Sequence, residues 1–487
     1  MSNHSKVIED YIMITRQALR NAGALLLILA PEALFARSNS VTAGLSMSYD
    51  INDREYEEVS DDLAIDGVTV ARIAEDDTYS RVVVRPLVSL VSKSKVDQFG
   101  LHAAPAVKYD LEDSDTDVDA LFALSGWRAI SKRWMVRSSD TFIRSDHYTS
   151  GTDQAADGEE NSPELSPDAG RKRFWRNTFN VDSEHIYGRE QKVILGFDYV
   201  VLRNDDSGEN SYNDYDMYQF AVKNEHRFNT YWGTKADLKV VRGEFDNDDR
   251  LTAAAEPDPS SVDPSGDLME YHADVILINR SFRPNNISLS YNYIGTTYDE
   301  TSRNDGDIHQ SRLTWQRDFL KRLSAGLGAG ISYEKTEEQK ANWGGNGIAE
   351  ILYAMERSSF RLSVEKRYDV DNFSGTEERG FIDVWDASLG FGHQLFEDVK
   401  VDAKVTYLYE DRQDRAANAS DDDATTLEEY NKNYFITGVG LYYSFRQDYS
   451  AGINYTFTRL NSERIGEDYD DHRLLLTISW ETEVFNW

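Results

Sequence analysis

The sequence predicts an all-β protein, a single transmembrane barrel of antiparallel strands that run up and down in chain order. Two observations carry this prediction. Apolar and polar side chains alternate with a period of two in segments of roughly ten to fifteen residues. The connections between these segments alternate between short and long. No sustained helical period and no second hydrophobic span follow the N-terminal region.

The N-terminal region, residues 1–36, has the order of a secretory signal peptide. Two arginines precede an apolar run over 22–30, and a region of small residues ends at Ala36. The apolar run is too short to span a bilayer as a mature helix. A short amphipathic helix is the alternative, and Met13 is an alternative start of the chain. We therefore expect an exported protein whose barrel occupies residues 37–487.

Composition argues against several classes of function. The chain has 86 acidic and 52 basic residues, a formal net charge of −34, which argues against binding to nucleic acid phosphates. It has no cysteine, which excludes disulfides and thiolate metal sites. Only 40% of its residues are hydrophobic, as expected where alternate residues of each strand meet lipid.

The alternating segments predict about twenty strands, an even number as in bacterial barrels. If the first strand and its link to the second (57–77) are left out, the alternative is about eighteen strands. We place the strands near 41–56, 78–93, 97–109, 117–130, 133–147, 172–184, 191–203, 215–227, 231–244, 268–282, 286–299, 308–320, 323–335, 343–356, 359–372, 381–395, 399–411, 430–445, 449–460 and 472–485.

Each strand is expected to present one face to lipid and one to the barrel interior, since successive side chains point to opposite sides. In the segment VKVDAKVTYLYE (399–410), valine, alanine and tyrosine alternate with Lys400, Asp402 and Lys404. The last strand, 472–485, also alternates, and its apolar face needs no protein partner if its solvent is lipid.

The connections support a membrane barrel because they sort by length. A soluble sandwich or propeller gives no reason for such sorting, whereas membrane barrels have short periplasmic turns and long extracellular loops. Closure of the barrel also pairs every backbone group in lipid. Short turns are expected at 131–133, 187–190, 282–285, 320–323, 357–359, 396–399 and 445–448. Long acidic loops are expected at 149–171, 204–214, 245–267, 412–429 and 461–471.

The chain ends on an aromatic pattern, Phe485 and Trp487. It is similar to the terminal signal that the barrel assembly machinery of Gram-negative bacteria recognises. It departs from that signal in ending on Trp rather than Phe and in having Thr482 where a glycine is common.

A second resemblance lies in residues 455–481, YTFTRLNSERIGEDYDDHRLLLTISWE. This segment resembles outer-membrane β-barrel porins found beside exopolysaccharide and exosortase gene clusters. The resemblance implies an outer-membrane barrel among lipid and lipopolysaccharide. It also implies a role in polysaccharide export, with a polysaccharide substrate and a periplasmic export partner.

The polar faces of the strands supply the candidate lumen-lining residues. Lysine and arginine there could guide an anionic polymer or solute. Alternatively, opposite charges on neighbouring strands hydrate the lumen without selecting anything, which we favour because the charges are balanced. The candidates are Lys223, Lys235, Asp237, Lys239, Glu270, His272, Asp274, Arg312, Arg361, Glu365, Arg367, Lys400, Asp402 and Lys404.

No catalytic signature is found, and we expect neither an enzyme nor a cofactor. HExxH, GxSxG and close histidine pairs are absent. His272 lies between Glu270 and Asp274 on one strand face, where it could hold a metal or act in acid–base chemistry; a solvated lumen residue is the favoured interpretation. The acidic run 421–423 could bind divalent cations, although a solvated loop is favoured.

Three functions remain open from the sequence. The first is a conduit or export component for an extracellular polysaccharide. The second is a general diffusion porin for small solutes, and the third is a non-conducting structural or adhesive barrel. A barrel of this width needs an element that prevents leakage. We expect a loop folded inward (149–171 or 245–267) or a periplasmic partner.

Overall fold

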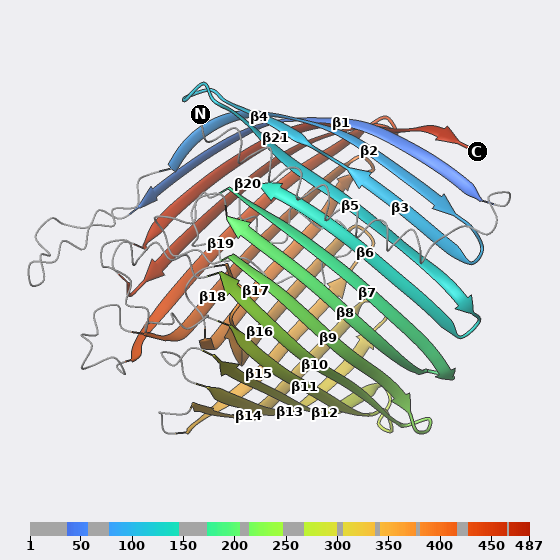
Figure 1. Ribbon diagram of the computed structural model, residues 1–487, viewed down its shortest axis with the longest axis vertical. Coiled ribbons are helices and arrows are strands. Elements are labelled where there is room, and N and C mark those ends of the chain that lie inside the picture. The colour runs from blue at the N-terminus through green and yellow to red at the C-terminus, as the bar shows by residue number, and fades with distance from the viewer. Residues whose placement is uncertain are drawn as a thin grey trace, which may run out of the picture.

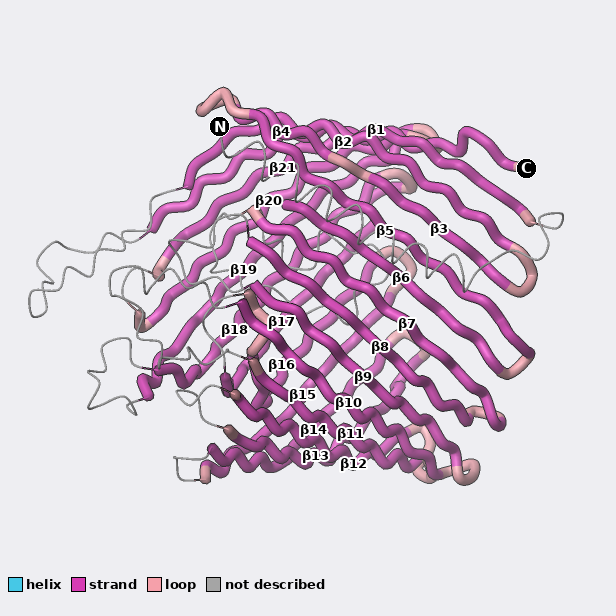
Figure 2. The backbone as a smooth tube through the Cα atoms, viewed as in Figure 1, coloured by secondary structure: helices cyan, strands magenta, loops and turns pink. Residues whose placement is uncertain are grey.

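The computed structural model describes residues 37–56, 77–145, 173–204, 214–246, 267–299, 305–336, 341–375, 380–415, 427–464 and 467–487. Within these ranges all regular secondary structure is β-strand (Figure 2). None of these residues belongs to a helix long and apolar enough to cross a membrane.

The strands follow the chain in order and tilt across the barrel wall (Figure 1). Their bounds are β1 Ser38–Tyr56, β2 Asp77–Lys93, β3 Asp97–Ala103, β4 Ala106–Asp110, β5 Thr116–Ser131, β6 Trp134–Ser145, β7 Phe174–Gly188, β8 Gln191–Asn204, β9 Asp214–Arg227, β10 Trp232–Asp246, β11 Leu268–Asn279, β12 Asn285–Tyr298, β13 Gly306–Leu320, β14 Leu323–Thr336, β15 Asn342–Ala354, β16 Ser358–Asp371, β17 Gly380–Phe396, β18 Val399–Arg415, β19 Leu427–Phe445, β20 Tyr449–Ser462 and β21 Tyr469–Asn486.

Antiparallel pairing runs around the sheet and closes it between the first and last strands. β1 pairs with β2 on one side and with β21 on the other. β3 and β4 both lie between β2 and β5, so they share one position in the wall. Pro105 separates them, and proline cannot donate to a ladder. The 21 strands therefore fill twenty positions.

The predicted closed all-β barrel is confirmed, and so is the count of twenty strand positions. The predicted strand 97–109 is β3 followed by β4. The first strand, whose omission gave the smaller alternative, is β1, paired with both of its neighbours over nearly its whole length.

The two ends of the barrel differ in their connections. At one end, the short-turn end, each connection has two to five residues. The N-terminal end of β1 also lies here beside the chain's last residue, since Asn39 and Trp487 exchange backbone hydrogen bonds of 2.9 and 3.0 Å. The opposite end is the long-loop end, where the β4–β5 connection, 111–115, is also short. The predicted loops 149–171 and most of 245–267 lie outside the described residues.

The outer face of the barrel is apolar. Phe220, Leu313, Leu327 and Ile478 all point outward and are between 58% and 62% exposed. The inner face instead carries ion pairs. Exposed apolar side chains on every part of a closed wall are stable in lipid and costly in water. The chain is therefore an integral β-barrel of the outer-membrane type.

Tyrosine and histidine form hydrogen-bonded pairs on this outer face. Tyr187 and His226 lie at the short-turn end with their Oη and Nδ1 atoms 3.0 Å apart. Tyr455 and His472 form a similar pair at 2.8 Å, with His472 near the long-loop end. Such amphipathic rings suit the boundary between hydrocarbon and water.

Ion pairs on the inner face strengthen the seam where the barrel closes. Arg473 of β21 donates to both carboxylate oxygens of Asp50 in β1, at 2.9 and 3.0 Å. The Asp50 side chain is only 6% exposed. β1 is the first strand of the chain and β21 is the last, so this ion pair joins the two ends of the sheet.

We expect Arg473→Ala to lower the free energy of unfolding by about 3–5 kcal/mol, because it leaves a buried carboxylate without its cation. Urea titration of the barrel in lipid vesicles, followed by tryptophan fluorescence, measures the change. Arg459→Ala is the control, since it removes an exposed bidentate pair with Asp470 and should cost less than about 1 kcal/mol. Equal losses in the two variants would contradict a specific role for the seam.

Candidate functional site, a constricted lumen

The barrel wall is incomplete between β15 and β16 at the long-loop end. β15 pairs with β16 from Ala354 opposite Ser359 up to Gly347 opposite Lys366. Beyond that point, among the described strands, residues 342–346 pair with β14 alone. β16 continues in register with β17 to its own end. The upper β16–β17 hairpin therefore separates from β15 but stays joined to the wall through β17, which pairs with β18 up to Ile382 opposite Arg412.

One glutamine side chain replaces the missing strand partner of this hairpin. Gln310 projects from the inner face of β13, and its Nε2 donates to the backbone oxygen of Tyr368 at 2.8 Å. The Tyr368 backbone nitrogen donates to Gln310 Oε1 at 3.1 Å. The amide thus satisfies both backbone groups that a neighbouring strand would otherwise pair.

The hairpin lies inside the barrel. By strand alternation Tyr368 and Phe381 belong to the outward faces of β16 and β17. They are nevertheless 6% exposed and pack on Ile294 and Ile308 of the inner wall. Val370 packs against the same group. The outward face of the hairpin therefore covers the inner face of β12 and β13.

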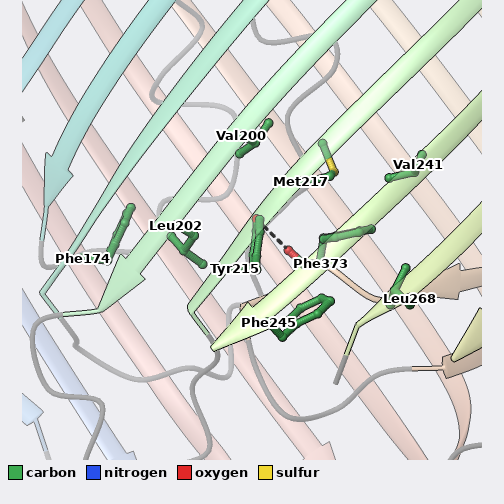
Figure 3. Packing of buried hydrophobic residues seen from close by; sticks show 9 residues of the cluster. All are labelled: Phe174, Val200, Leu202, Tyr215, Met217, Val241, Phe245, Leu268 and Phe373. Carbon is green, nitrogen blue, oxygen red and sulfur yellow. Dashed lines mark hydrogen bonds between the residues drawn. The ribbon is translucent and has the colours of Figure 1, made fainter. Parts of the chain in front are cut away.

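Residues 372–375 continue from β16, and we call them the tip. All four are buried. The Phe373 ring lies 5.3 Å from Tyr215 and 5.7 Å from Phe245, centroid to centroid. Figure 3 shows it among apolar side chains from the opposite stretch of wall. These wall residues, from β7 to β11, are Phe174, Val200, Leu202, Tyr215, Met217, Val241, Phe245 and Leu268.

Hydrogen bonds fix the tip to this wall. Asn372 donates through Nδ2 to Glu270 Oε1 at 2.7 Å and accepts from the Tyr298 hydroxyl at 2.8 Å. The Tyr215 hydroxyl donates to the Phe373 backbone oxygen at 3.2 Å. Each polar group of the Asn372 side chain therefore has a partner. Gly375 follows with a φ of 81°, a left-handed conformation that glycine adopts easily.

Three inner-wall glycines make room for the rings of the hairpin. A Cβ atom at Gly243 would lie 2.8 Å from the Phe373 ring, and one at Gly306 would lie 2.6 Å from the Phe381 ring. A Cβ atom at Gly344 would meet the Tyr368 hydroxyl and come within 2.9 Å of its ring carbons. Larger residues at these positions would displace the hairpin.

The predicted lumen-lining residues lie on the inner face of the described strands. They form two separate groups, and several of them make ion pairs. One group occupies β9–β11, where Lys223 lies 3.6 Å from Asp237 and Lys235 lies 3.9 Å from Glu225. Lys239 is opposite His272 in the register, and Asp274 is opposite Asp237.

The other group lies on β16 and β18. Arg361 pairs with Glu350 at 3.0 Å, and Lys400 pairs with Asp402 at 3.5 Å. Arg367 contacts Asp369 at 3.1 Å within its own strand. Arg312 of β13 reaches Glu365 of β16 at 2.7 Å and so links the wall to the base of the hairpin. Charges of both signs therefore alternate over the inner wall.

Glu270 differs from a solvated lumen residue. Glu270 is 4% exposed, and its second carboxylate oxygen lies 2.8 Å from His272 Nε2. Glu270 contacts Asn372, so the tip covers it. The physical role of Glu270 in this structure is to anchor the tip. Among the described residues no group of three histidine, aspartate or glutamate side chains is placed to hold a metal ion.

Lys404 stands apart from the other charged residues of the inner wall. Its neighbours in the register are Gly390 and Gly438, and a Cβ atom at either glycine would have no atom within 4 Å. The lysine is exposed and makes no ion pair within the described ranges. It therefore presents an uncompensated positive charge to the lumen.

The tip and its anchors were missed by the sequence analysis. Alternation predicts on which face of a strand a side chain lies. It does not predict whether the end of a strand stays in the barrel wall or folds into the interior. One available signal was the inner-face parity of Val200, Leu202, Met217 and Leu268. A wall in contact with water would be polar there, so an apolar patch indicates a covering element.

At the short-turn end the inner wall forms a hollow of about 310 Å³. Its lining includes Lys192, Lys235, Arg280 and Glu225. This part of the inner wall is therefore charged, in contrast to the apolar contact around Phe373.

Comparison with known proteins shows the fold alone. No protein-family model matches the chain, and no curated protein matches its sequence. A ferric enterobactin receptor of Pseudomonas aeruginosa is 9% identical with a TM-score of 0.50, over 91% of this chain and 81% of the receptor. OpdQ of the same organism is 10% identical with a TM-score of 0.40, over 92% and 98%. OpdF, solved with glucuronate, is 12% identical with a TM-score of 0.40, over 91% and 98%.

The buried state of the tip can be tested by thiol labelling. Ser374 is 3% exposed, and the native chain contains no cysteine. We expect Ser374→Cys to react slowly with a membrane-impermeant maleimide. Adding Phe373→Ala should speed labelling by about tenfold or more, since loss of the buried ring favours local opening. Asn461→Cys, at an exposed position, calibrates full reactivity. Fast labelling of Ser374→Cys alone would contradict the buried tip.

Proposed function

We propose that this protein is a passive outer-membrane channel for small polar solutes, narrowed by its own infolded hairpin. The single observation that carries the proposal is the tip, which crosses the lumen from β16 to the wall of β7–β11. The rest of the inner face, with its ion pairs, suits water and polar solutes.

The width of the barrel explains why a constriction is needed. Barrels of about 16–18 strands enclose aqueous channels, and barrels of about 22 strands have a plugged lumen. A wall of twenty positions lies between these sizes. A short hairpin tip narrows such a lumen at one level and leaves the charged hollow below it open. We infer a sieve for small molecules.

Export of a polysaccharide remains a hypothesis based on the resemblance of residues 455–481. No comparison supports the link to exopolysaccharide clusters, and no described residue favours a polymer over a small solute. A periplasmic export partner, lipopolysaccharide contacts, recognition of Phe485 and Trp487 by the assembly machinery, and the signal peptide 1–36 likewise remain predictions. The diffusion-porin alternative agrees better with the inner wall.

Planar bilayer recording tests the channel. We expect steady conductance from the native protein and a conductance about twofold higher from the Asn372→Ala, Phe373→Ala double variant, because removal of the anchors releases the constriction. Asn461→Ala, a change at an exposed position, should leave conductance unchanged. If neither the native protein nor the double variant conducts, the channel proposal fails and a structural or adhesive barrel is favoured.

The charge at Lys404 gives a second electrical test. Because neighbouring charges on the inner wall largely compensate, we expect weak ion selectivity in the native protein. Lys404→Glu should shift the reversal potential in a KCl gradient toward cation selectivity, since no described residue compensates the charge of this lysine. Lys132→Glu, in a turn outside the lumen, is the control. An unchanged reversal potential in Lys404→Glu would show that ions do not pass this part of the wall.

A further inference from the structure

The upper part of β15 has one free backbone edge. Residues 342–346 pair with β14 on one side. On the other side none of the described strands pairs with them. Backbone groups at a strand edge are strong hydrogen-bonding groups and a ready template for another strand. In a membrane wall, an unpaired edge is especially costly.

The segment that would complete this edge is the upper part of β16. The observed register ends with Gly347 opposite Lys366. If it continues, Gly345 lies opposite Tyr368 and Asn342 lies opposite Asp371. Five residues of β15, 342–346, would then pair with five of β16, 367–371.

The side chains of β16 suit this second position as well as the observed one. In the continued register, Tyr368 and Val370 would face outward into lipid, with Tyr368 covering the bare backbone of Gly345. Arg367, Asp369 and Asp371 would face the polar lumen. In the observed position Tyr368 and Val370 instead pack on the inner wall. One alternating sequence therefore satisfies both arrangements.

We propose that the upper β16–β17 hairpin is a gate with two positions, and this inference rests on the proposed channel function. In the docked position the tip lies against β7–β11 and Gln310 pairs with the backbone of Tyr368. In the zipped position residues 367–371 join the edge of β15 and the tip withdraws from the opposite wall. Zipping completes the barrel wall and widens the lumen in one movement.

The two positions exchange one set of interactions for another. Docking keeps the apolar cluster around Phe373, the hydrogen bonds of Asn372 and the two bonds of Gln310. Zipping exchanges them for backbone ladder bonds over 342–346 and for contact of two apolar side chains with lipid. Packed elements with two alternative partners switch between discrete states rather than deform gradually.

Two double-cysteine variants of the full chain test the gate. Glu270→Cys with Asn372→Cys traps the docked position, because these side chains touch at 2.7 Å. Asn342→Cys with Asp371→Cys traps the zipped position. Each pair is crosslinked in lipid with a short bifunctional thiol reagent that a reductant cleaves. In bilayer recordings we expect lower conductance from the docked trap and higher conductance from the zipped trap. After reduction, each variant should return to its own conductance before crosslinking.

A glycine pair provides an independent test without crosslinking. Gly344→Ala places a methyl group against the Tyr368 ring of the docked hairpin, so it should raise conductance about twofold or more by favouring the zipped position. Gly326→Ala is the matched control on the adjacent strand, where the nearest atom, the Trp315 backbone oxygen, is 3.8 Å away. It should behave as the native protein.

The outcomes separate the gate from the channel. If the native protein conducts but the 342/371 pair does not crosslink and Gly344→Ala leaves conductance unchanged, the gate is overturned and the channel stands. If the 342/371 pair crosslinks without raising conductance, the hairpin moves but does not gate, which also overturns the inference. If no form conducts, the proposed function itself fails.

Discussion

Backbone hydrogen bonding is the constraint on which the rest of this structure depends. A strand in lipid has no water to satisfy its amide groups, so the wall must close on itself. The pairing of β1 with β21 provides that closure, and the Asp50–Arg473 pair reinforces it from the inner side. Where the wall parts between β15 and β16, the same constraint is met at one residue of β16, while the edge of β15 at 342–346 pairs with no described strand on that side. Gln310 offers one donor and one acceptor to the backbone of Tyr368, as a strand would.

After closure, the outer face of the wall meets lipid and the inner face meets water. The side chains on each face suit the solvent that they meet. Outward positions carry leucine, isoleucine and aromatic rings, while inward positions carry balanced ion pairs. The exception is informative. Val200, Leu202 and Leu268 face inward yet are apolar and buried, because the infolded tip rather than water is their neighbour. The constriction is therefore built from the ends of two wall strands, the tip between them and the apolar inner-wall patch on which the tip packs. The described residues include no separate plug domain.

Most of the barrel could be predicted from sequence, and the tip could not, for one physical reason. Period-two alternation encodes the face on which a side chain lies, so the strand positions and the inward placement of Lys235, Asp237 and Lys404 follow from the pattern. It does not encode which neighbour a strand end prefers. For residues 367–371 the wall and the interior suit the same alternation, so only the three-dimensional contacts of Tyr368 with Gln310 and Gly344 distinguish them. The burial of Glu270 escaped prediction for the same reason, since Asn372 of the tip, which contacts it, is remote in sequence.

The glycine–ring contacts have a consequence for how this pore could change during evolution. Gly243, Gly306 and Gly344 lie on three strands, and the rings that they accommodate belong to two others or to the tip between them. A side chain at any of these glycines would force a ring of the hairpin or tip to shift, and restoring the packing would require a matching change on a different strand. A lineage that lost the tip would also keep an apolar band facing water. The packing of the constriction can thus be disturbed through a single substitution, whereas its recovery needs a further change. The hairpin and the opposite wall are therefore constrained to evolve together.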